Sequence, residues 1–295
     1  MRFGILGNIN KSAILNVTGN LISYLNHKRL SYVVHTELGE WFNKSNTGVQ
    51  IEKGVMTTDA DLPQWCDIII ALGGDGTMLT AARIVGAHGN PILGVNLGKL
   101  GFLAEVSIDE LTSCLNDITA GKYFIEDRIV LQTNSSNDPH SYYTLNDVVI
   151  DKGSSPRIID LETTVNGDYL VTYTADGLII ATPTGSTAYS LASGGPIVVP
   201  KSDVNVITPI SPHTLSARPV IVPNDSIIKI KVTESAKPVH MIGDGQIEMF
   251  YDAPVEFTIQ RAPHTIRLIK RKNRNYFDLL RMKLMWGKDL RREQQ

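Results

Sequence analysis

Short apolar runs and helical repeats of apolar residues alternate along the first hundred residues of the chain. The helical period occurs at residues 13–25, and a second helix is predicted over residues 77–87. Apolar runs that indicate buried strands lie at residues 3–6, 32–34, 67–72 and 91–96. Strands that alternate with helices predict a parallel sheet with helices on both faces. We therefore predict an α/β domain over residues 1–107.

The pattern changes after residue 107, where one predicted helix (108–120) is followed by short β-rich runs between turns. The predicted strands cover residues 129–133, 142–149, 158–165, 178–181, 204–209, 220–222, 227–232, 255–261 and 265–269. These runs predict an all-β, sandwich-like domain over residues 108–272. A C-terminal helix is expected within residues 273–295, with Phe277, Leu280, Leu284 and Met285 on one face. We expect it to pack back on the first domain, because an amphipathic helix must bury its apolar face.

Composition narrows the possible classes of protein. With 42% hydrophobic and 20% charged residues and a formal net charge of −2, the chain is typical of a globular protein that does not bind nucleic acid electrostatically. No apolar run approaches the roughly 20 residues that span a membrane, and the N-terminus resembles a strand more than a signal peptide. Cys66 and Cys114 are the two cysteines, which favours a reducing, cytoplasmic location. No cluster of side chains has the spacing of a metal site.

The most informative loop is Gly73-Gly74-Asp75-Gly76, which lies between the predicted strand 67–72 and the following helix. Glycine lets the backbone approach a ligand closely, and the N–H groups and dipole of a helix start favour phosphate. A carboxylate there repels phosphate unless it meets a metal cation or accepts a proton. The loop thus indicates chemistry on a nucleotide or phosphorylated ligand, with a plain strand-to-helix turn as an equal alternative. It has neither the Walker pattern nor the dinucleotide spacing.

A second polar segment runs from Asp176-Gly177 to Pro196, around the end of the predicted strand 178–181. Its hydroxyl groups, together with a helix start that Ser186 or Thr187 is expected to cap, offer donors for ribose, adenine or phosphate. Tyr189 can offer a ring face to a base. Long polar loops on a scaffold usually carry function, which favours ligand binding over a simple capped turn.

Two further segments are weaker indications. Asn146-Asp147 interrupts a predicted strand, and the pair can bind a ribose diol or an adenine edge, although a surface pair or β-bulge explains it equally well. The proline-bounded loop 209–219 carries His213 and Arg218. Arg218 can meet a phosphate or carboxylate, but a structural salt bridge is the stronger expectation.

Together these segments resemble the NAD kinase family over most of the chain. The family marks are residues 73–79, 96–103, 146–147, 176–196, 209–219 and 244–246. The first is shared with diacylglycerol and sphingosine kinases and loosely with phosphofructokinases, whereas Thr184–Tyr189 and His213–Pro219 are more specific. The resemblance implies a Rossmann-like, phosphofructokinase-like parallel sheet in the first domain, a β-sandwich in the second, and an NAD site in the crevice between them.

The resemblance also implies a reaction, in which the γ-phosphoryl group of ATP moves to the 2′-hydroxyl of the adenosine ribose of NAD to give NADP. Asp75 would accept the hydroxyl proton, and Mg²⁺ carried with ATP would offset charge on the transferring group. The implied phosphate-binding residues are Gly73, Gly74, Gly76 and Thr77. The implied NAD-binding residues are Asp75, Gly76, Asn146, Asp147, Arg157, Asp176, Thr187, Ala188, Tyr189, Ser190, Leu191, Ala192 and Gln246. Homodimers or homotetramers are implied, with neither nucleic acid nor membrane as partner.

The chain departs from the family pattern at two positions. The family usually has Glu after the Asn, whereas this chain has Asp147, which keeps the carboxylate with a shorter reach. Many members carry a basic residue two places before Asp176, where this chain has Thr174, and we expect Arg157 to supply the positive charge instead.

Two rival functions remain open from the sequence. A lipid or sugar kinase of the same superfamily explains the first loop but not the hydroxyl-rich segment. A non-enzymatic NAD- or NADP-binding regulator would be favoured by loss of the base, yet Asp75 is present.

Overall fold

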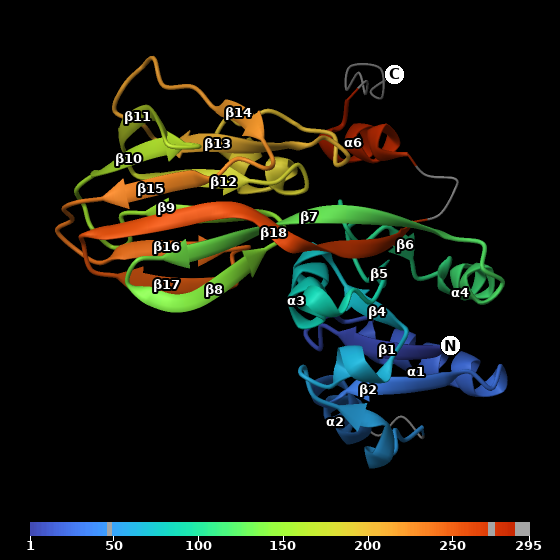
Figure 1. Ribbon diagram of the computed structural model, residues 1–295. Helices are drawn as coiled ribbons and strands as arrows, with labels where there is room; N and C mark the ends of the chain where they lie inside the picture. Colours follow the sequence, from blue (N-terminus) through green and yellow to red (C-terminus); the bar gives the residue numbers. More distant parts are fainter. Residues whose placement is uncertain (46–48, 271–274, 287–295) are drawn as a thin grey trace. The chain divides into compact units, whose positions relative to one another are not determined.

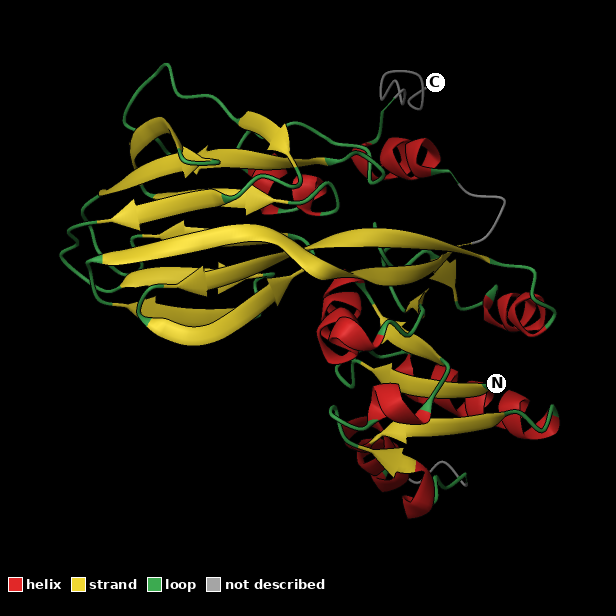
Figure 2. Cartoon of the chain, viewed as in Figure 1, coloured by secondary structure: helices red, strands yellow, loops and turns green. Residues whose placement is uncertain are grey.

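The structure, a computed structural model, describes residues 1–45, 49–270 and 275–286. It divides into two compact units: unit 1 contains Met1–Asp127 and Arg267–Gln295, and unit 2 contains Arg128–Ile266. Helices concentrate in unit 1 and strands dominate unit 2 (Figure 2). Unit 1 includes the helix α4 (Leu111–Thr119), which the sequence pattern assigned to the second domain. Of the predicted C-terminal helix 273–295, residues 273, 274 and 287–295 lie outside the described residues.

Unit 1 is built on a parallel sheet with the strand order β5-β4-β1-β2-β3 (Figure 1). The strands are β1 (Arg2–Gly7), β2 (Ser31–His35), β3 (Met56–Thr57), β4 (Ile68–Gly73) and β5 (Ile92–Asn96), and the short β6 (Val106–Ser107) pairs with β5. From β1 the chain runs outward through β2 and β3, and β4 and β5 lie on the other side of β1. The loops after β1 and β4 therefore flank a topological switch point, where open α/β sheets bind ligands.

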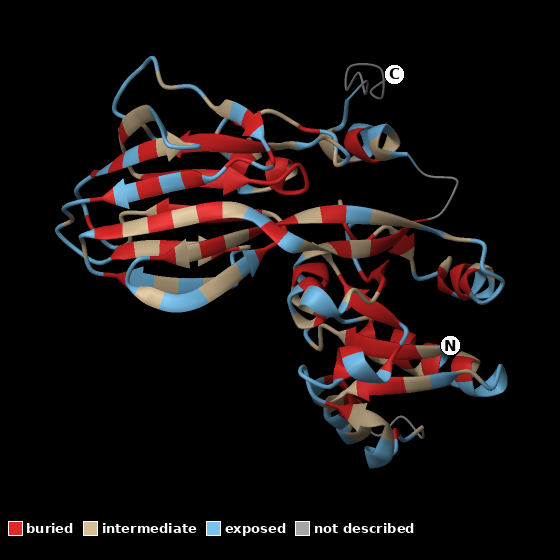
Figure 3. Ribbon diagram, in the orientation of Figure 1, coloured by how far each residue is buried: buried red, intermediate tan, exposed pale blue. Residues whose placement is uncertain are grey.

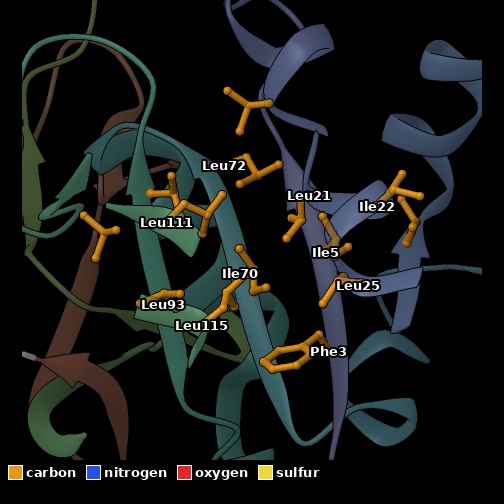
Figure 4. Packing of buried hydrophobic residues seen from close by; sticks show 14 of the residues in the cluster. Phe3, Ile5, Leu21, Ile22, Leu25, Ile70, Leu72, Leu93, Leu111 and Leu115 are labelled. Atoms are coloured by element: carbon orange, nitrogen blue, oxygen red, sulfur yellow. The ribbon is translucent and has the colours of Figure 1, made fainter. Parts of the chain in front are cut away.

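Helices cover both faces of this sheet, as predicted. The helices α1 (Ile14–His27), α2 (Thr36–Lys44) and α4 share one apolar cluster with β1, β4 and β5, part of which is shown in Figure 4. The helix α3 (Asp75–Val85) lies on the opposite face, where Met78 packs so tightly on Gly94 of β5 that a Cβ there would come within 2.7 Å of its sulfur. The described part of unit 1 also contains three short 3-10 helices: η1 (Lys53–Val55), η2 (Leu62–Trp65) and η3 (Gly86–His88).

Unit 2 contains two sheets. One has the order β14 (Val220–Pro223), β13 (Val204–Ile210), β12 (Gly177–Ala181), β9 (Asp147–Asp151), β16 (Val239–Gly243) and β17 (Ile247–Tyr251). The other joins β11 (Asp168–Ala175), β10 (Ile159–Val165), β15 (Ile228–Val232) and β18 (Val255–Lys270), with β7 (Phe124–Ser135) on β18 and β8 (Asp138–Thr144) on β7. All pairings between neighbours in the first sheet are antiparallel.

The two sheets of unit 2 pack face to face around one apolar core, which confirms the predicted sandwich. Ile228 and Phe257 from one sheet share a cluster with Ile150 and Leu178 from the other. Strand β15 alternates between buried and exposed residues, as a strand with one solvated face should (Figure 3). Strand β12 is buried at every position, because the far face of its sheet is covered by Val198 and its neighbours.

Several elements differ from the sequence predictions. The helix α2 and the strands β11, β16 and β17 were not predicted. The predicted strand 142–149 is two strands, β8 and β9, while the predicted strands 255–261 and 265–269 form the single strand β18. The break between β8 and β9 falls at Asn146, where a long-range contact described below bends the chain.

The C-terminal helix α6 (Tyr276–Leu284) buries only part of the face predicted for it. Leu280 is 3% exposed, as predicted, and Leu279, which was not on that face, is 5% exposed. Of the other predicted residues, Leu284 is partly buried, whereas Phe277 and Met285 are 56% and 63% exposed. Asn275 caps the helix by accepting a hydrogen bond from the Asp278 N–H. In the described part of the chain, no helix is long and apolar enough to span a membrane.

Candidate active site

The Asp75 side chain, at the start of α3, holds the turn that follows β5. Its Oδ2 accepts a hydrogen bond from the N–H of Phe102 at 2.8 Å. Its Oδ1 accepts from the N–H groups of Leu103 at 2.9 Å and Ala104 at 3.2 Å. These hydrogen bonds bring the loop 73–76 and residues 102–104 together. We name the arrangement of Asp75 and residues 101–104 the Asp75 turn.

Three glycines shape the Asp75 turn. A Cβ at Gly101 would lie 1.9 Å from Oδ1 of Asp75, and a Cβ at Gly73 would lie 2.0 Å from Oγ1 of Thr77. Both positions require glycine, because a side chain would displace the groups beside it. A Cβ at Gly74 would meet nothing within 4 Å, so the backbone before Asp75 is open on that side. An anion can therefore approach the first N–H groups of α3.

The helix α6 lies against the outer side of the Asp75 turn. The ring centroids of Phe102 and Tyr276 are 6.5 Å apart, and the Lys283 ammonium lies 5.5 Å from the Phe102 ring centroid. Phe102, whose N–H donates to Asp75, is therefore also in contact with α6.

A second carboxylate holds a turn in unit 2. Asp244, between β16 and β17, accepts hydrogen bonds from the N–H groups of Leu145 at 2.8 Å, Asn146 at 2.7 Å and Asp147 at 3.2 Å. Its own N–H donates to the Asp147 carbonyl at 3.0 Å. Asp244 has a φ of 52°, in the left-handed region that Asp tolerates in tight hairpins. We name this arrangement the Asp244 turn.

The Asp147 side chain is buried beside Asp244, with 5% of its surface exposed. Burial, reinforced by the nearby Asp244 carboxylate, raises the pKa of Asp147 to about 7, although a hydrogen bond from the Tyr189 N–H acts in the opposite direction. By contrast, the Asn146 side chain is only partly buried and has no hydrogen-bond partner in the described part of the chain. Asn146 thus offers a free amide next to a carboxyl that is partly protonated at neutral pH.

The loop after β12 is joined to the Asp244 turn. The Thr182 hydroxyl donates to the Leu145 carbonyl at 2.6 Å, and the Thr182 N–H donates to the Asn146 carbonyl at 2.8 Å. A Cβ at Gly185 would lie 2.0 Å from the Asn146 carbonyl oxygen, so only glycine allows this approach. The sequence-predicted residues Asn146, Asp147 and Tyr189 are therefore brought together by the fold.

The hydroxyl groups of this loop mostly serve the fold, which corrects the prediction that they face a ligand. Ser186 is fully buried and donates to the Pro183 carbonyl at 2.7 Å, and its oxygen accepts from the Val198 N–H at 3.0 Å. Ser190 is also fully buried and bonds to the Thr208 hydroxyl at 2.8 Å. The predicted side-chain cap is wrong: the short helix α5 (Tyr189–Ala192), which follows η4 (Gly185–Thr187), has no side-chain cap.

The last part of this loop, residues 187–192, is partly exposed to solvent. Tyr189 is 46% exposed, Ala192 is exposed, and Thr187, Ala188 and Leu191 are partly buried. The phenol ring and the backbone of residues 187–192 can therefore contact a ligand, whereas the Ser190 side chain cannot without rearrangement. Structural and ligand-facing hydroxyl groups could not be distinguished in the sequence, because both kinds follow the same strand.

The cation beside Asp176 is Lys152, which the sequence analysis did not identify. The Lys152 Nζ lies 2.8 Å from Oδ1 of Asp176. Arg157 lies in an exposed turn, and no contact joins its guanidinium to a described residue. In the 209–219 loop His213 is exposed, and Arg218 donates to the carbonyls of Leu215 and Ala217, not to an acid. The expected salt bridge of Arg218 is therefore wrong.

The chain thus combines a parallel α/β unit with a β-sandwich unit, and each unit holds one carboxylate-centred turn. Sequence models of the ATP-NAD kinase N-terminal and C-terminal domains match residues 3–123 and 145–271. The chain belongs to the ATP-NAD kinase family.

Individual relatives agree with this membership. An NAD kinase from Geotalea daltonii is 39% identical over 97% of this chain and 99% of its own length. One from Bacteroides fragilis is 40% identical over 99% of this chain and 100% of its own. Yeast NADH kinase complexed with NADH has a TM-score of 0.87 and 26% identity, over 98% of this chain and 88% of that one. An NAD kinase from Archaeoglobus fulgidus in complex with ATP shares the fold, with a TM-score of 0.77 and 21% identity over 97% and 99% of the two chains.

Proposed function

We propose that this chain transfers the γ-phosphoryl group of ATP to the 2′-hydroxyl of the adenosine ribose of NAD, giving NADP and ADP. The observation that carries the proposal is the match of both family domains, in order, together with identity near 40% over almost the whole chain to curated NAD kinases. The chain is thus an NAD kinase by family, and the geometry of the site supports the roles proposed for its residues.

Asp75 is the proposed proton acceptor. A carboxylate offers about four lone-pair directions, two on each oxygen. In the Asp75 turn, Oδ1 accepts two N–H groups and Oδ2 accepts one. One acceptor direction therefore remains on Oδ2, and the three N–H groups fix where it points. A ribose hydroxyl in that direction would pass its proton to Oδ2 as its oxygen attacks phosphorus.

The open backbone around Gly74 and Gly76 is the proposed seat of the phosphates, with Gly73 and Thr77 supporting it from behind. Among the described residues no group of three or more His, Cys, Asp or Glu side chains could hold a metal ion. A site with so few carboxylates fits a divalent cation that is held mainly by the ATP phosphates, with one carboxylate nearby. Mg²⁺ usually binds in this way. Bound there, Mg²⁺ would neutralise charge that develops on the transferring group.

Unit 2 supplies the proposed recognition of NAD. The free Asn146 amide and the Asp147 carboxyl are suited to a ribose diol or an adenine edge, and the exposed Tyr189 ring to a base. Asp176, Gln246 and the backbone of residues 187–192 complete the proposed contacts. Lys152 holds Asp176, and Arg157 remains available to a diphosphate from its exposed turn.

We also propose that the protein self-associates as a homodimer or homotetramer and works in the cytoplasm. Unit 2 exposes large apolar side chains, among them Leu215 at 95%, Tyr169 at 65% and Ile221 at 52%. Cys66 and Cys114 are both free thiols, in keeping with a reducing compartment. Light scattering after size-exclusion chromatography tests the subunit number, with a monomer contradicting the first of these proposals.

The decisive assay incubates the purified chain with NAD, ATP and Mg²⁺ and measures NADP by its reduction with a NADP-specific dehydrogenase. We expect NADP formation that depends on all three components. Absence of NADP, with phosphate moving instead to a lipid or sugar acceptor, would falsify the proposal. NAD binding without any phosphoryl transfer would favour a regulatory protein.

A further inference from the structure

The Asp244 carboxylate, to which the proposed function gives no role, accepts hydrogen bonds from three consecutive backbone N–H groups. These belong to Leu145 and Asn146, which lie between β8 and β9, and to Asp147, the first residue of β9. Asp244 lies about a hundred residues further along the chain, so the contact is tertiary. An anion at three N–H groups forms charge-assisted hydrogen bonds, which are stronger than those of a neutral acceptor.

We propose that Asp244 is a positioning residue, which fixes Asn146 and Asp147 in the geometry that recognises the vicinal diol of a ribose. This inference rests on the proposed function and adds a residue and a mechanism to it. Asp244 itself faces the backbone of its own unit, so it acts through Asn146 and Asp147.

On the β16 side, Asp244 holds the backbone of residues 145–147. Strand β9 pairs with β12 from Asp147 onward and with β16 from Val148 onward. The N–H groups of Leu145, Asn146 and Asp147 precede the β16 ladder, and Asp244 supplies the acceptor for each of them. The carbonyls of Leu145 and Asn146 are held from the other side by Thr182. The segment is thus clamped by one carboxylate and one threonine.

Asp147 and Asp244 also interact electrostatically. Asp147 faces the Asp244 carboxylate from the β16–β17 turn, the Tyr189 N–H from α5, and Ala181 across the β12 pairing, which carries no charge. Burial raises the pKa of Asp147 to about 7, and the carboxylate of the partly buried Asp244 adds to this rise, because two like charges disfavour double ionisation. A protonated Asp147 can donate to one hydroxyl of a diol and accept from the other, whereas an ionised one only accepts. We therefore expect affinity for NAD to fall as the pH rises through about 7.

The test compares the wild type with Asp244→Asn, which keeps size and one acceptor oxygen but removes the charge. Calorimetry with NAD alone, without ATP, should show affinity reduced about tenfold, as expected when a buried N–H loses its partner. In steady-state assays KM for NAD should rise by a similar factor, while kcat and KM for ATP stay within about threefold. The matched control is Asp225→Asn, an exposed turn aspartate between β14 and β15, which should leave all values unchanged.

The pH profile separates positioning from a merely structural role. In Asp244→Asn the like charge is gone, so the midpoint of NAD affinity against pH should move to lower pH. Carboxyl ¹³C NMR of the ligand-free protein should show the same downward shift for Asp147, and the amide protons of Asn146 and Asp147 should exchange faster with solvent. An unchanged NAD affinity, or an unchanged Asp147 titration in the folded variant, overturns the proposal.

These measurements also separate this inference from the proposed function. If the wild type neither binds NAD nor makes NADP, the proposed function fails, and the NMR titration and amide exchange still decide whether Asp244 positions residues 145–147. If the wild type makes NADP and Asp244→Asn behaves like it in every assay, only the positioning role fails. Should Asp244→Asn unfold, Thr182→Val tests the opposite half of the clamp, and wild-type affinity for NAD in that variant would count against the proposal.

Discussion

The Asp75 turn in unit 1 and the Asp244 turn in unit 2 have the same hydrogen-bonding arrangement but different surroundings. In each, one carboxylate accepts three consecutive N–H groups of a turn distant in sequence, at distances of 2.7–3.2 Å. The Asp75 carboxylate stands at the mouth of a helix, beside open glycine backbone. The Asp244 carboxylate stands in a hairpin beside a second, buried carboxyl. The hydrogen bonds are alike, and the surroundings decide what each carboxylate can do.

This difference is the basis for the proposal that one turn serves chemistry and the other recognition. Asp75 retains an acceptor direction beside the open backbone at Gly74, where it would take a proton from an attacking hydroxyl. Asp244 is surrounded by its own unit, and its effect reaches a ligand through Asn146 and Asp147. Substitutions in the first turn should therefore lower kcat, and substitutions in the second should raise KM for NAD.

The largest effect is expected from Asp75→Asn. The amide cannot accept the hydroxyl proton, so kcat should fall about 10²–10⁴-fold, the range for a general base. NAD binding by calorimetry should change much less, because most of the proposed NAD contacts belong to unit 2. Wild-type turnover in the folded variant would remove Asp75 from its assigned role.

Gly101→Ala tests whether the turn must hold the base in place. The added methyl would sit 1.9 Å from Oδ1 of Asp75, so either the carboxylate or the turn must move. We expect kcat to fall about 10²-fold, as misplacement of a reacting group by about 1 Å can do. Gly98→Ala is the matched control in the same loop, since a Cβ there meets nothing within 4 Å. Equal kcat values for the two variants would argue against the turn's role.

The buried carboxyl of the second turn predicts a pH dependence of stability. The pKa of Asp147 is about 7 in the folded chain and about 3.9 when unfolded. The folded state therefore binds more protons between these values, and the free energy of unfolding should fall as pH rises from about 4 to about 7. Asp147→Asn should flatten this fall and stabilise the protein above pH 7 by the order of 2–4 kcal/mol. Urea unfolding at pH 5 and pH 8 measures the difference; an equal slope in both proteins contradicts the burial argument.

The sequence predicted the architecture of both units because periodicity is local. Apolar runs and helical repeats located most strands of the sheet in unit 1, and the strand-to-helix transition at Gly73–Gly76 pointed to Asp75. The missed elements, such as β16 and β17, have short segments of mixed polarity whose partners are distant strands. Their stability comes from the sandwich core, which no local window contains.

The sites were predictable as segments but not as contacts. Nothing local to Asp244 indicates that its carboxylate would hold residues 145–147, since the contact spans about a hundred positions. In the same way, the sequence suggests that Ser186 and Ser190 donate hydrogen bonds to a ligand. The fold shows that their hydroxyl groups are instead hydrogen-bonded to Val198 and Thr208, respectively. The hydrogen-bond partner of a hydroxyl group can be identified only in the folded structure, because the small, neutral side chain does not indicate it in the sequence.

The smallest effects are expected from substitutions of Lys152, which is paired with Asp176, and of Arg157. The Lys152–Asp176 pair is partly exposed, with side-chain exposures of 25% and 35%, so Lys152→Ala should lower the free energy of unfolding by only about 0.5–1 kcal/mol. Arg157→Ala removes an exposed side chain and should leave stability within about 0.5 kcal/mol. If Arg157 meets the diphosphate of NAD, its loss should instead raise KM for NAD severalfold, more at low salt than at high salt. Equal KM values in wild type and Arg157→Ala, with a raised KM in Lys152→Ala, would give Lys152 the role that the sequence assigned to Arg157.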